Sequence, residues 1–306
     1  MTTTIDGLDQ VGATGRTRTT PDRAGLSRKR RARIVRALTY LGMTLLAVFF
    51  ILPVVTMIVL SLQPNETQIL ADQRTIWAFI PRTVSLENYR DIFDRDGVAR
   101  AVFNSAFITF TTVALGLVVN SMCAFSLARL QWRGRNVLLG LIVALMIVPF
   151  QTVSVPLLLI VNRLGWLDTY HVQIIPFVAN PFFIFLFYQA FIGLPKEIEE
   201  AAVIDGASLA TIYARIVVPL SRPTFATVGI LQALFVWGSF LWPLMVTRGP
   251  DARPLPVAMQ VLFSDPQVPF GDVFAFAAVM TLPILALYLV FQKWFVQSVA
   301  SQGLKG

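Results

Sequence analysis

Charged residues are scarce in this sequence. They make up 14% of its 306 residues, whereas hydrophobic residues make up 56%. Soluble domains usually carry about 25% charged residues, which give water a polar surface to contact. Because this chain cannot hide so much apolar surface from water, we expect lipid to be its solvent. The sequence therefore predicts a membrane protein.

Cysteine and histidine are each represented once, by Cys123 and His171. A single cysteine can form neither an intrachain disulfide nor a metal cluster. Cys123 lies in an apolar run, and we interpret it as a small buried apolar residue. The sequence also lacks a P-loop, an HExxH motif and a CxxC motif, which argues against a membrane enzyme.

Ionisable residues are missing from the centres of the long apolar runs. A run of about 20 apolar residues crosses a bilayer as a helix, and six runs reach that length. They comprise residues 37–62, 101–128, 137–161, 173–193, 223–247 and 273–295. Ion-coupled carriers usually keep ionisable relays inside the membrane, and channels use a filter motif or a charged ring. A stand-alone carrier or channel is therefore disfavoured.

Basic residues concentrate at the N-terminus, where residues 1–36 hold nine of the 25 in the chain. No aromatic residues are interleaved with them to stack on bases, so nucleic-acid binding is not indicated. We expect residues 1–36 to form a disordered tail at the membrane surface. The run at 37–62 is longer than a signal-peptide core of about 7–15 residues, so we expect it to be retained as a spanning helix.

The Lys and Arg residues between the runs indicate the orientation of the chain. With the N-terminus inside, the cytoplasmic segments hold 17 of them and the external segments hold eight. Because basic residues favour the cytoplasmic side, we expect both termini in the cytoplasm. The sequence thus predicts an all-α, six-helix domain over 37–296, a cytoplasmic C-terminal tail over 297–306, and a short amphipathic helix in the external stretch "SLENYRDIFDRDG".

A few amide side chains fall at membrane depth. We interpret them as hydrogen-bonding groups between helices, which is the commoner role of such residues, in preference to solute contacts. They are Asn104, Asn120, Gln151, Asn180, Gln189 and Gln232.

The segment 194–222 is acidic, although its side of the membrane should be basic: it holds four acidic and three basic residues. Pro195 and the glutamates after it suit the first turn of a helix. Gly206 suits a left-handed helix stop and Ser208 the N-cap of a second helix, which Pro219 should end. The segment therefore predicts two short helices around a glycine turn. They form either a solvated surface turn or a docking element for a partner.

The stretch "EAAVIDGASLATIYARIVVPLSRP", Glu200–Pro223, resembles the EAA signature of ABC-importer permeases. Further similarity lies in "NSAFITFTTVALGLVVNSMCAFSLARLQWRGRN" and "PFFIFLFYQAFIGLPKEIEEAA", and it covers residues 37–306. The branch that these stretches resemble is that of the carbohydrate-uptake permeases, similar to the smaller membrane subunit of the maltose importer.

The resemblance implies the type I ABC importer architecture in a bacterial inner membrane. In this family the EAA loop is a coupling helix that enters a cleft of a cytoplasmic ATP-binding subunit, and that subunit holds ATP and Mg, so this chain itself needs no cofactor. A second, similar permease and an extracytoplasmic substrate-binding protein complete the family's assembly. The loop passes the ATPase motion to the membrane helices and so gives alternating access.

Carried over by position, Glu200 would pair with a basic residue of the ATPase, and Gly206 would allow the sharp turn that Asp205 braces. The motif residues that the resemblance assigns to coupling are Glu200, Ala201, Ala202, Asp205, Gly206 and Ala207.

The resemblance also implies a sugar or sugar-like solute, and sugars are often bound by aromatic faces and amides. Helix packing and interfacial anchoring explain the same residues, so both interpretations stay open. The candidates for the substrate path are Phe150, Gln151, Asn180, Tyr188, Gln189, Trp237 and Trp242. Two alternatives also stay open: a permease of the same class for another solute, and a membrane scaffold that docks a cytosolic partner through 194–222.

Overall fold

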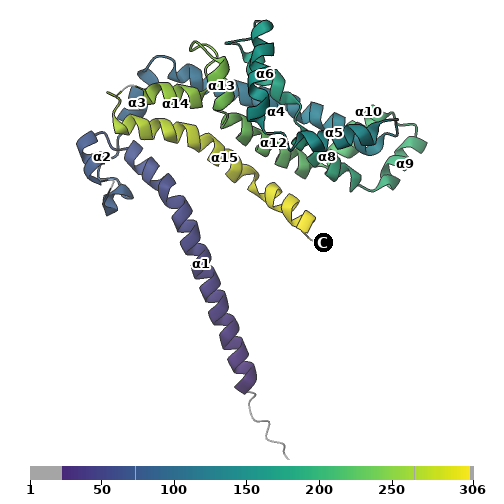
Figure 1. Cartoon of the computed structure of the whole chain (residues 1–306). Coiled ribbons are helices and arrows are strands. Elements are labelled where there is room, and N and C mark those ends of the chain that lie inside the picture. The colour runs from purple at the N-terminus through teal and green to yellow at the C-terminus, as the bar shows by residue number, and fades with distance from the viewer. Residues whose placement is uncertain (1–22, 73, 265, 304–306) are drawn as a thin grey trace, which may run out of the picture. The chain divides into compact units, whose positions relative to one another are not determined.

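The computed structural model describes residues 23–72, 74–264 and 266–303, and every regular element within these ranges is helical (Figure 1). The chain divides into two compact units, Met1–Val54 and Val55–Gly306. Helix α1 (Arg23–Ser61) begins inside the segment expected to be a tail, because the Arg, Lys, Ala and Leu residues there are good helix formers. The predicted disorder of residues 1–22 lies outside the described residues.

Four helical segments are long and apolar enough to cross a membrane: Arg31–Ser61, Val98–Arg129, Tyr170–Ile192 and Phe270–Gln292. Two pairs of bent helices pass the same test together, which gives up to six spans if each pair is one span. The described part of the chain therefore has four to six candidate spans. Five of them lie at predicted runs, whereas the pair Leu209–Leu220 and Arg222–Trp237 overlaps the run predicted at 223–247 only in part. The last candidate span belongs to α15 (Phe270–Gly303), which continues into the expected C-terminal tail.

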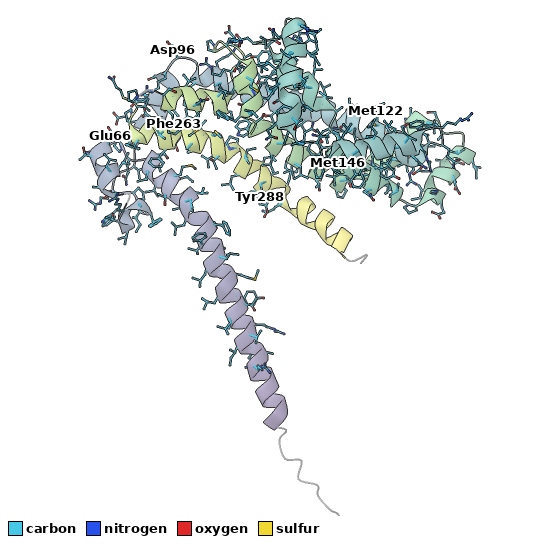
Figure 2. The ribbon with its side chains drawn as sticks, in the orientation of Figure 1. Glu66, Asp96, Met122, Met146, Phe263 and Tyr288 are labelled. Atoms are coloured by element: carbon cyan, nitrogen blue, oxygen red, sulfur yellow. The ribbon has the colours of Figure 1, made fainter. Side chains whose placement is uncertain are left out.

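The run predicted at 137–161 is bent. Helix α5 (Arg135–Leu145) and helix α6 (Phe150–Arg163) meet at an angle of 103°. Pro149 lies at the N-cap of α6, and proline both lacks an N–H group and pushes the preceding residue out of helical conformation. Figure 2 marks Met146 at this junction. The apolar pattern alone did not show this bend.

The run predicted at 223–247 is interrupted as well. Helix α12 (Arg222–Trp237) ends before Gly238, and the short helix α13 (Leu241–Val246) follows it. The run at 173–193 comprises α7 (Tyr170–Val178) and α8 (Pro181–Ile192), with Asn180 as the N-cap of α8. Its side chain accepts a hydrogen bond from the N–H of Phe182.

Helix α4 (Val98–Arg129) lies at the centre of the second unit and packs against α7, α8 and α12. Around its C-terminal half, Phe187 and Phe191 of α8 are fully buried. Around its N-terminal half, a second core joins Ile92 of α3 (Glu87–Asp94), Leu255 of α14 (Leu255–Phe263) and Phe276 of α15. The amphipathic helix predicted in "SLENYRDIFDRDG" is thus confirmed as α3.

Buried amides join the helices, as predicted for Asn104, Asn120 and Gln232. Asn120 donates to the carbonyl of Val178 and accepts from the N–H of Asn180, both at 2.9 Å. Gln232 on α12 donates to the carbonyls of Thr112 on α4 and Phe177 on α7, at 3.3 Å each. Because an unpaired amide is costly away from water, these bonds fix how the helices pack. Gln151 and Gln189 differ, since their side chains are exposed on this chain.

The stretch before α3 holds α2 (Glu66–Asp72) and the short helix η1 (Ile76–Ala78). Two polar contacts attach α3 and the turn after it to the rest of the unit. Asn88 donates to the carbonyls of Ser61 and Gln63 at 2.9 and 2.8 Å. Arg95 forms an ion pair with Asp272 of α15 at 2.8 Å. Figure 2 marks Asp96 at the turn into α4 and Phe263 at the end of α14.

Candidate functional site

The acidic segment 194–222 folds as the predicted pair of short helices. Helix α9 (Lys196–Ile204) ends in the turn at Asp205–Ser208, with Gly206 at a φ of +81°. The N–H of Gly206 bonds the carbonyl of Val203 at 3.0 Å, and the N–H of Ala207 bonds that of Ala202 at 2.9 Å. These two bonds define a Schellman motif, which needs a residue with positive φ at the Gly206 position.

The second part of the loop begins at Ser208, as predicted. Its hydroxyl accepts a hydrogen bond from the N–H of Thr211 at 3.2 Å and caps α10 (Leu209–Ile212). A π-helical turn, η2 (Tyr213–Val217), follows, and α11 (Val218–Leu220) completes the helix. The helix ends at Leu220, one residue beyond Pro219. It then meets α12 at an angle of 79°.

An ion pair joins the loop to α4. Arg129, in the last turn of α4, places its Nε 2.9 Å from Oε1 of Glu199, and the two side chains are only 4% and 16% exposed. The same guanidinium donates from Nη2 to the carbonyl of Leu194 at 2.8 Å. Arg129 therefore binds both the helix α9 and the chain that enters it.

A second polar contact joins the loop to α4 about two turns nearer the N-terminus of α4. The hydroxyls of Tyr213 in η2 and Ser121 on α4 lie 2.7 Å apart. The ring of Tyr213 also packs against Phe125, with centroids 5.4 Å apart. The loop is thus held to the C-terminal half of α4 through both of its helical parts.

Burial raises the pKa of the Glu199 carboxyl above its usual range. The positive charges of Arg129 and Lys196 act in the opposite direction and favour the ionised form. The carboxylate therefore depends on its cationic neighbours to stay charged.

Sequence reasoning did not single out Arg129 or Glu199. Arg129 entered only as a topological charge, and Glu199 only as one of several acids near a helix start. One signal was available: Glu199 and Ala202 are three residues apart and so share a helix face. Ala202 packs on the buried core of α4 and α8, so its neighbour on that face also turns inward.

The residues assigned to coupling fall on two faces. Ala202 and Ala207 are half-buried against the core, whereas Glu200, Ala201, Asp205 and Gly206 are exposed. Large apolar side chains accompany the exposed acids: Ile204 is 86% exposed and Val203 is 58% exposed. We call this surface, formed by Glu200, Ala201, Val203, Ile204 and Asp205, the docking face. Val203 and Ile204 thus form adjacent exposed apolar surface beside the acids.

The candidates for the substrate path are spread over the unit. Phe150 and Trp242 pack with Phe177 in an aromatic cluster, at centroid distances of 5.6 to 6.1 Å. Trp242 also donates to the carbonyl of Val172 at 2.9 Å and is buried. These contacts give both rings a role in packing α6, α7 and α13.

The other aromatic candidates lie elsewhere. Trp237 donates to the carbonyl of Met280 at 2.9 Å. It lines an open groove of about 850 Å³ between α4, α12 and α15, whose side chains there are mostly apolar. Tyr188 is half-buried on α8, where its ring stacks on Phe185 at 6.4 Å. In the described ranges, no group of three His, Cys, Asp or Glu residues could hold a metal ion.

Long apolar helices, buried amides between them and a helix–turn–helix loop with exposed acids are the features of a multi-pass membrane protein. The chain belongs to the family of binding-protein-dependent transport system inner membrane components, whose family model matches residues 116–301. It is therefore a permease subunit of an ABC importer, in which a separate subunit hydrolyses ATP.

Several relatives align over most of their length. The arabinooligosaccharides transport system permease protein AraQ of Halalkalibacterium halodurans is 34% identical over 89% of this chain and 98% of its own. The trehalose transport system permease protein SugB of Mycobacterium tuberculosis is 34% identical over 86% and 95%. The melibiose/raffinose/stachyose import permease protein MelC of Bacillus subtilis is 30% identical over 91% and 100%.

A solved structure shares the fold. It is a chain of a bacterial ABC transporter involved in the import of the acidic polysaccharide alginate, with a TM-score of 0.77 at 23% identity. The match covers 87% of this chain and 98% of that one. A second structure, of a bacterial alginate ABC transporter in complex with alginate pentasaccharide-bound periplasmic protein, matches with a TM-score of 0.57.

Proposed function

We propose that this chain is the translocation subunit of an importer for a sugar or sugar-like solute, and that loop 194–222 couples it to an ATP-binding subunit. The observation that carries the coupling assignment is the two-sided loop. One side holds Glu199 against Arg129 of α4, and the other presents the docking face. Val203 and Ile204 lie next to each other on that side, and a partner that covered them would remove their apolar surface from water.

The names of the relatives support the solute class. Three curated relatives, at 30% to 34% identity, are named for arabino-oligosaccharides, for trehalose and for melibiose, raffinose and stachyose. A sugar or sugar-like solute is thus favoured over other solutes of the same importer class.

The partners follow from the same assignment. Two cytoplasmic ATP-binding subunits, a second and similar permease, and an extracytoplasmic solute-binding protein would complete the importer. We infer six spans that cross a bacterial inner membrane. The excess of basic residues in alternate loops supports an orientation with both termini in the cytoplasm.

Purification in mild detergent tests the assembly. We expect the tagged chain to recover an ATP-binding subunit and a second multi-pass permease. Recovery of a cytosolic partner without any ATP-binding fold would support a scaffold instead and would contradict the proposal.

Uptake tests the solute. Cells that lack this chain should lose the uptake of at least one labelled di- or oligosaccharide, and the chain supplied in trans should restore it. Unchanged uptake of a sugar panel, together with lost uptake of an amino acid or an inorganic ion, would show that the solute class is wrong.

A further inference from the structure

Helix α4 contacts polar groups at both of its ends. It is a continuous helix of 32 residues, which corresponds to a length of about 48 Å at 1.5 Å per residue. Figure 1 shows α9 and α10 at one end of the second unit, with α3 and α14 at the other. Helix α4 therefore connects the coupling loop to the opposite end of the unit.

At its N-terminal end, α4 holds the segment 250–255. The side chain of Asn104 is fully buried and donates to the carbonyls of Asp251 and Arg253 at 3.0 and 2.9 Å. Its Oδ1 accepts from the hydroxyl of Tyr170 at 2.6 Å. Ser105 accepts from the N–H of Leu255 at 2.7 Å. In the proposed topology this segment faces outward.

At its C-terminal end, α4 holds the coupling loop through Arg129 and Ser121. Of the two contacts, the ion pair is the more demanding. Arg129 is only 4% exposed, and a buried charge becomes costly when its ion-pair partner leaves, so the pair favours one arrangement of α9 on α4. The carbonyl of Leu194 accepts a further hydrogen bond from the same guanidinium.

The other helices of the described chain connect the coupling loop to the opposite end of the unit less directly than α4 does. The pair α5–α6 bends by 103° and the pair α11–α12 by 79°, while α7 and α8 are separate helices. Helix α15 is continuous, but its packing partners are α2, α3, α12 and α14, which lie outside the coupling loop. A stiff, unbroken helix transmits a displacement with the least loss.

We propose that Arg129 and Glu199 are a positioning pair that fixes loop 194–222 to α4, so that a shift of the loop moves the outer segment 250–255. This inference rests on the proposed function, because it takes the loop as the place where the ATPase acts. The inference adds two things to the proposed function: α4 as the connection between the loop and the outer segment, and the ion pair that holds the loop to α4. Neither residue contacts solute or nucleotide; both act by holding α9 in place.

The first test uses the assembled importer in lipid nanodiscs with its binding protein. We expect Glu199→Gln and Arg129→Gln to lower the stimulation of ATP hydrolysis by loaded binding protein by about fivefold or more, the lower range of allosteric couplings. Co-purification with the ATP-binding subunit should persist, because the docking face is intact. The reversed pair, Arg129→Glu with Glu199→Arg, should recover a part of the stimulation. Glu87→Gln on α3 is a matched control in an exposed first turn.

The second test measures the link between the loop and segment 250–255 by hydrogen–deuterium exchange on the full chain. We expect faster exchange at the amides of 250–255 in Glu199→Gln than in the parent or in Glu87→Gln, with α8 unchanged. Unchanged exchange there, or unchanged stimulation in both single variants, would overturn the proposal. If the parent protein recruits no ATP-binding subunit, the proposed function is wrong, whereas the exchange result still decides whether α4 links the two ends.

Discussion

The side chain of Gln232 on α12 fills the space that Gly116 leaves on α4. A Cβ atom at Gly116 would overlap the amide group of Gln232. That amide is fully buried, and it bonds the carbonyls of Thr112 and Phe177. One missing side chain thus allows one polar side chain to join three helices.

Gly116→Ala should therefore destabilise the protein. The added methyl group displaces Gln232, and overpacking of this kind costs about 1–3 kcal/mol. We expect a clear drop in the melting temperature of the detergent-solubilised chain. Gly140→Ala on α5 is the control, because a Cβ atom at Gly140 would have no neighbouring atom within 4 Å. Equal melting temperatures for the two variants would contradict the packing seen at Gly116.

Gly206→Pro should separate docking from folding. Proline fixes φ near −65°, which is incompatible with the +81° at Gly206, and it removes the N–H that bonds Val203. Gly165 ends α6 in the same motif, with a φ of +69° and the equivalent bonds to Asn162 and Val161. We expect both proline variants to lose stability, but only Gly206→Pro to lose co-purification with the ATP-binding subunit. Loss in both would show that the defect is general.

Glu200→Lys should weaken the attachment of the ATP-binding subunit while the spans stay inserted. Glu200 is exposed on the docking face, so reversal of its charge opposes a basic partner and leaves the chain's own packing unchanged. Co-purification at increasing salt measures the effect. Glu87→Lys reverses an exposed charge at the distant α3 and should have no effect. Full retention of the subunit by Glu200→Lys would remove Glu200 from the coupling residues.

Coupling should fall in mildly acidic buffer. Because burial raises the pKa of Glu199, this carboxyl takes up a proton at a higher pH than an ordinary glutamate, and its pair with Arg129 weakens. The charged groups around it are Arg129 from α4 and Lys196 from its own helix. Glu199→Gln has no proton to gain, so its lower stimulation should vary less with pH in this range.

Protonation of Glu199 should lower coupling, but it should not lower the free energy of unfolding. A carboxyl with a raised pKa in the folded state binds protons more readily there than in the unfolded chain. Its contribution to the free energy of unfolding is therefore largest below the unfolded pKa and is lost as the pH rises through the folded pKa. Acidification should lower coupling without a loss of melting temperature from this group. A parallel fall of both would point to another titrating site.

Deletion of residues 1–25 should leave uptake unchanged, because no stretch of it resembles the permease family. Western blotting of membranes controls for the amount of inserted protein. Lost uptake at equal insertion would assign a function to this tail.

Local chemistry made the loop predictable from its sequence. Gly206 and Ser208 act through their own backbone and the residues within five positions, so their roles could be predicted without tertiary information. The inward orientation of the Glu199 side chain could not be predicted in this way, because it depends on Arg129, which is distant in the sequence. The bend at Pro149 has the same limitation. Proline marks a break in the helix, but the residues around it carry no signal for the angle of 103°.

The break between α5 and α6 also determines where this chain must be hydrated. Pro149 is the N-cap of α6, and no side chain caps the helix there. The first amide groups of a helix need acceptors from outside it, and hydrocarbon provides none. If α5 and α6 form one broken span, water or another protein must therefore reach the start of α6, between two strongly apolar helices. A bilayer of lipid alone would be an incomplete solvent for this subunit.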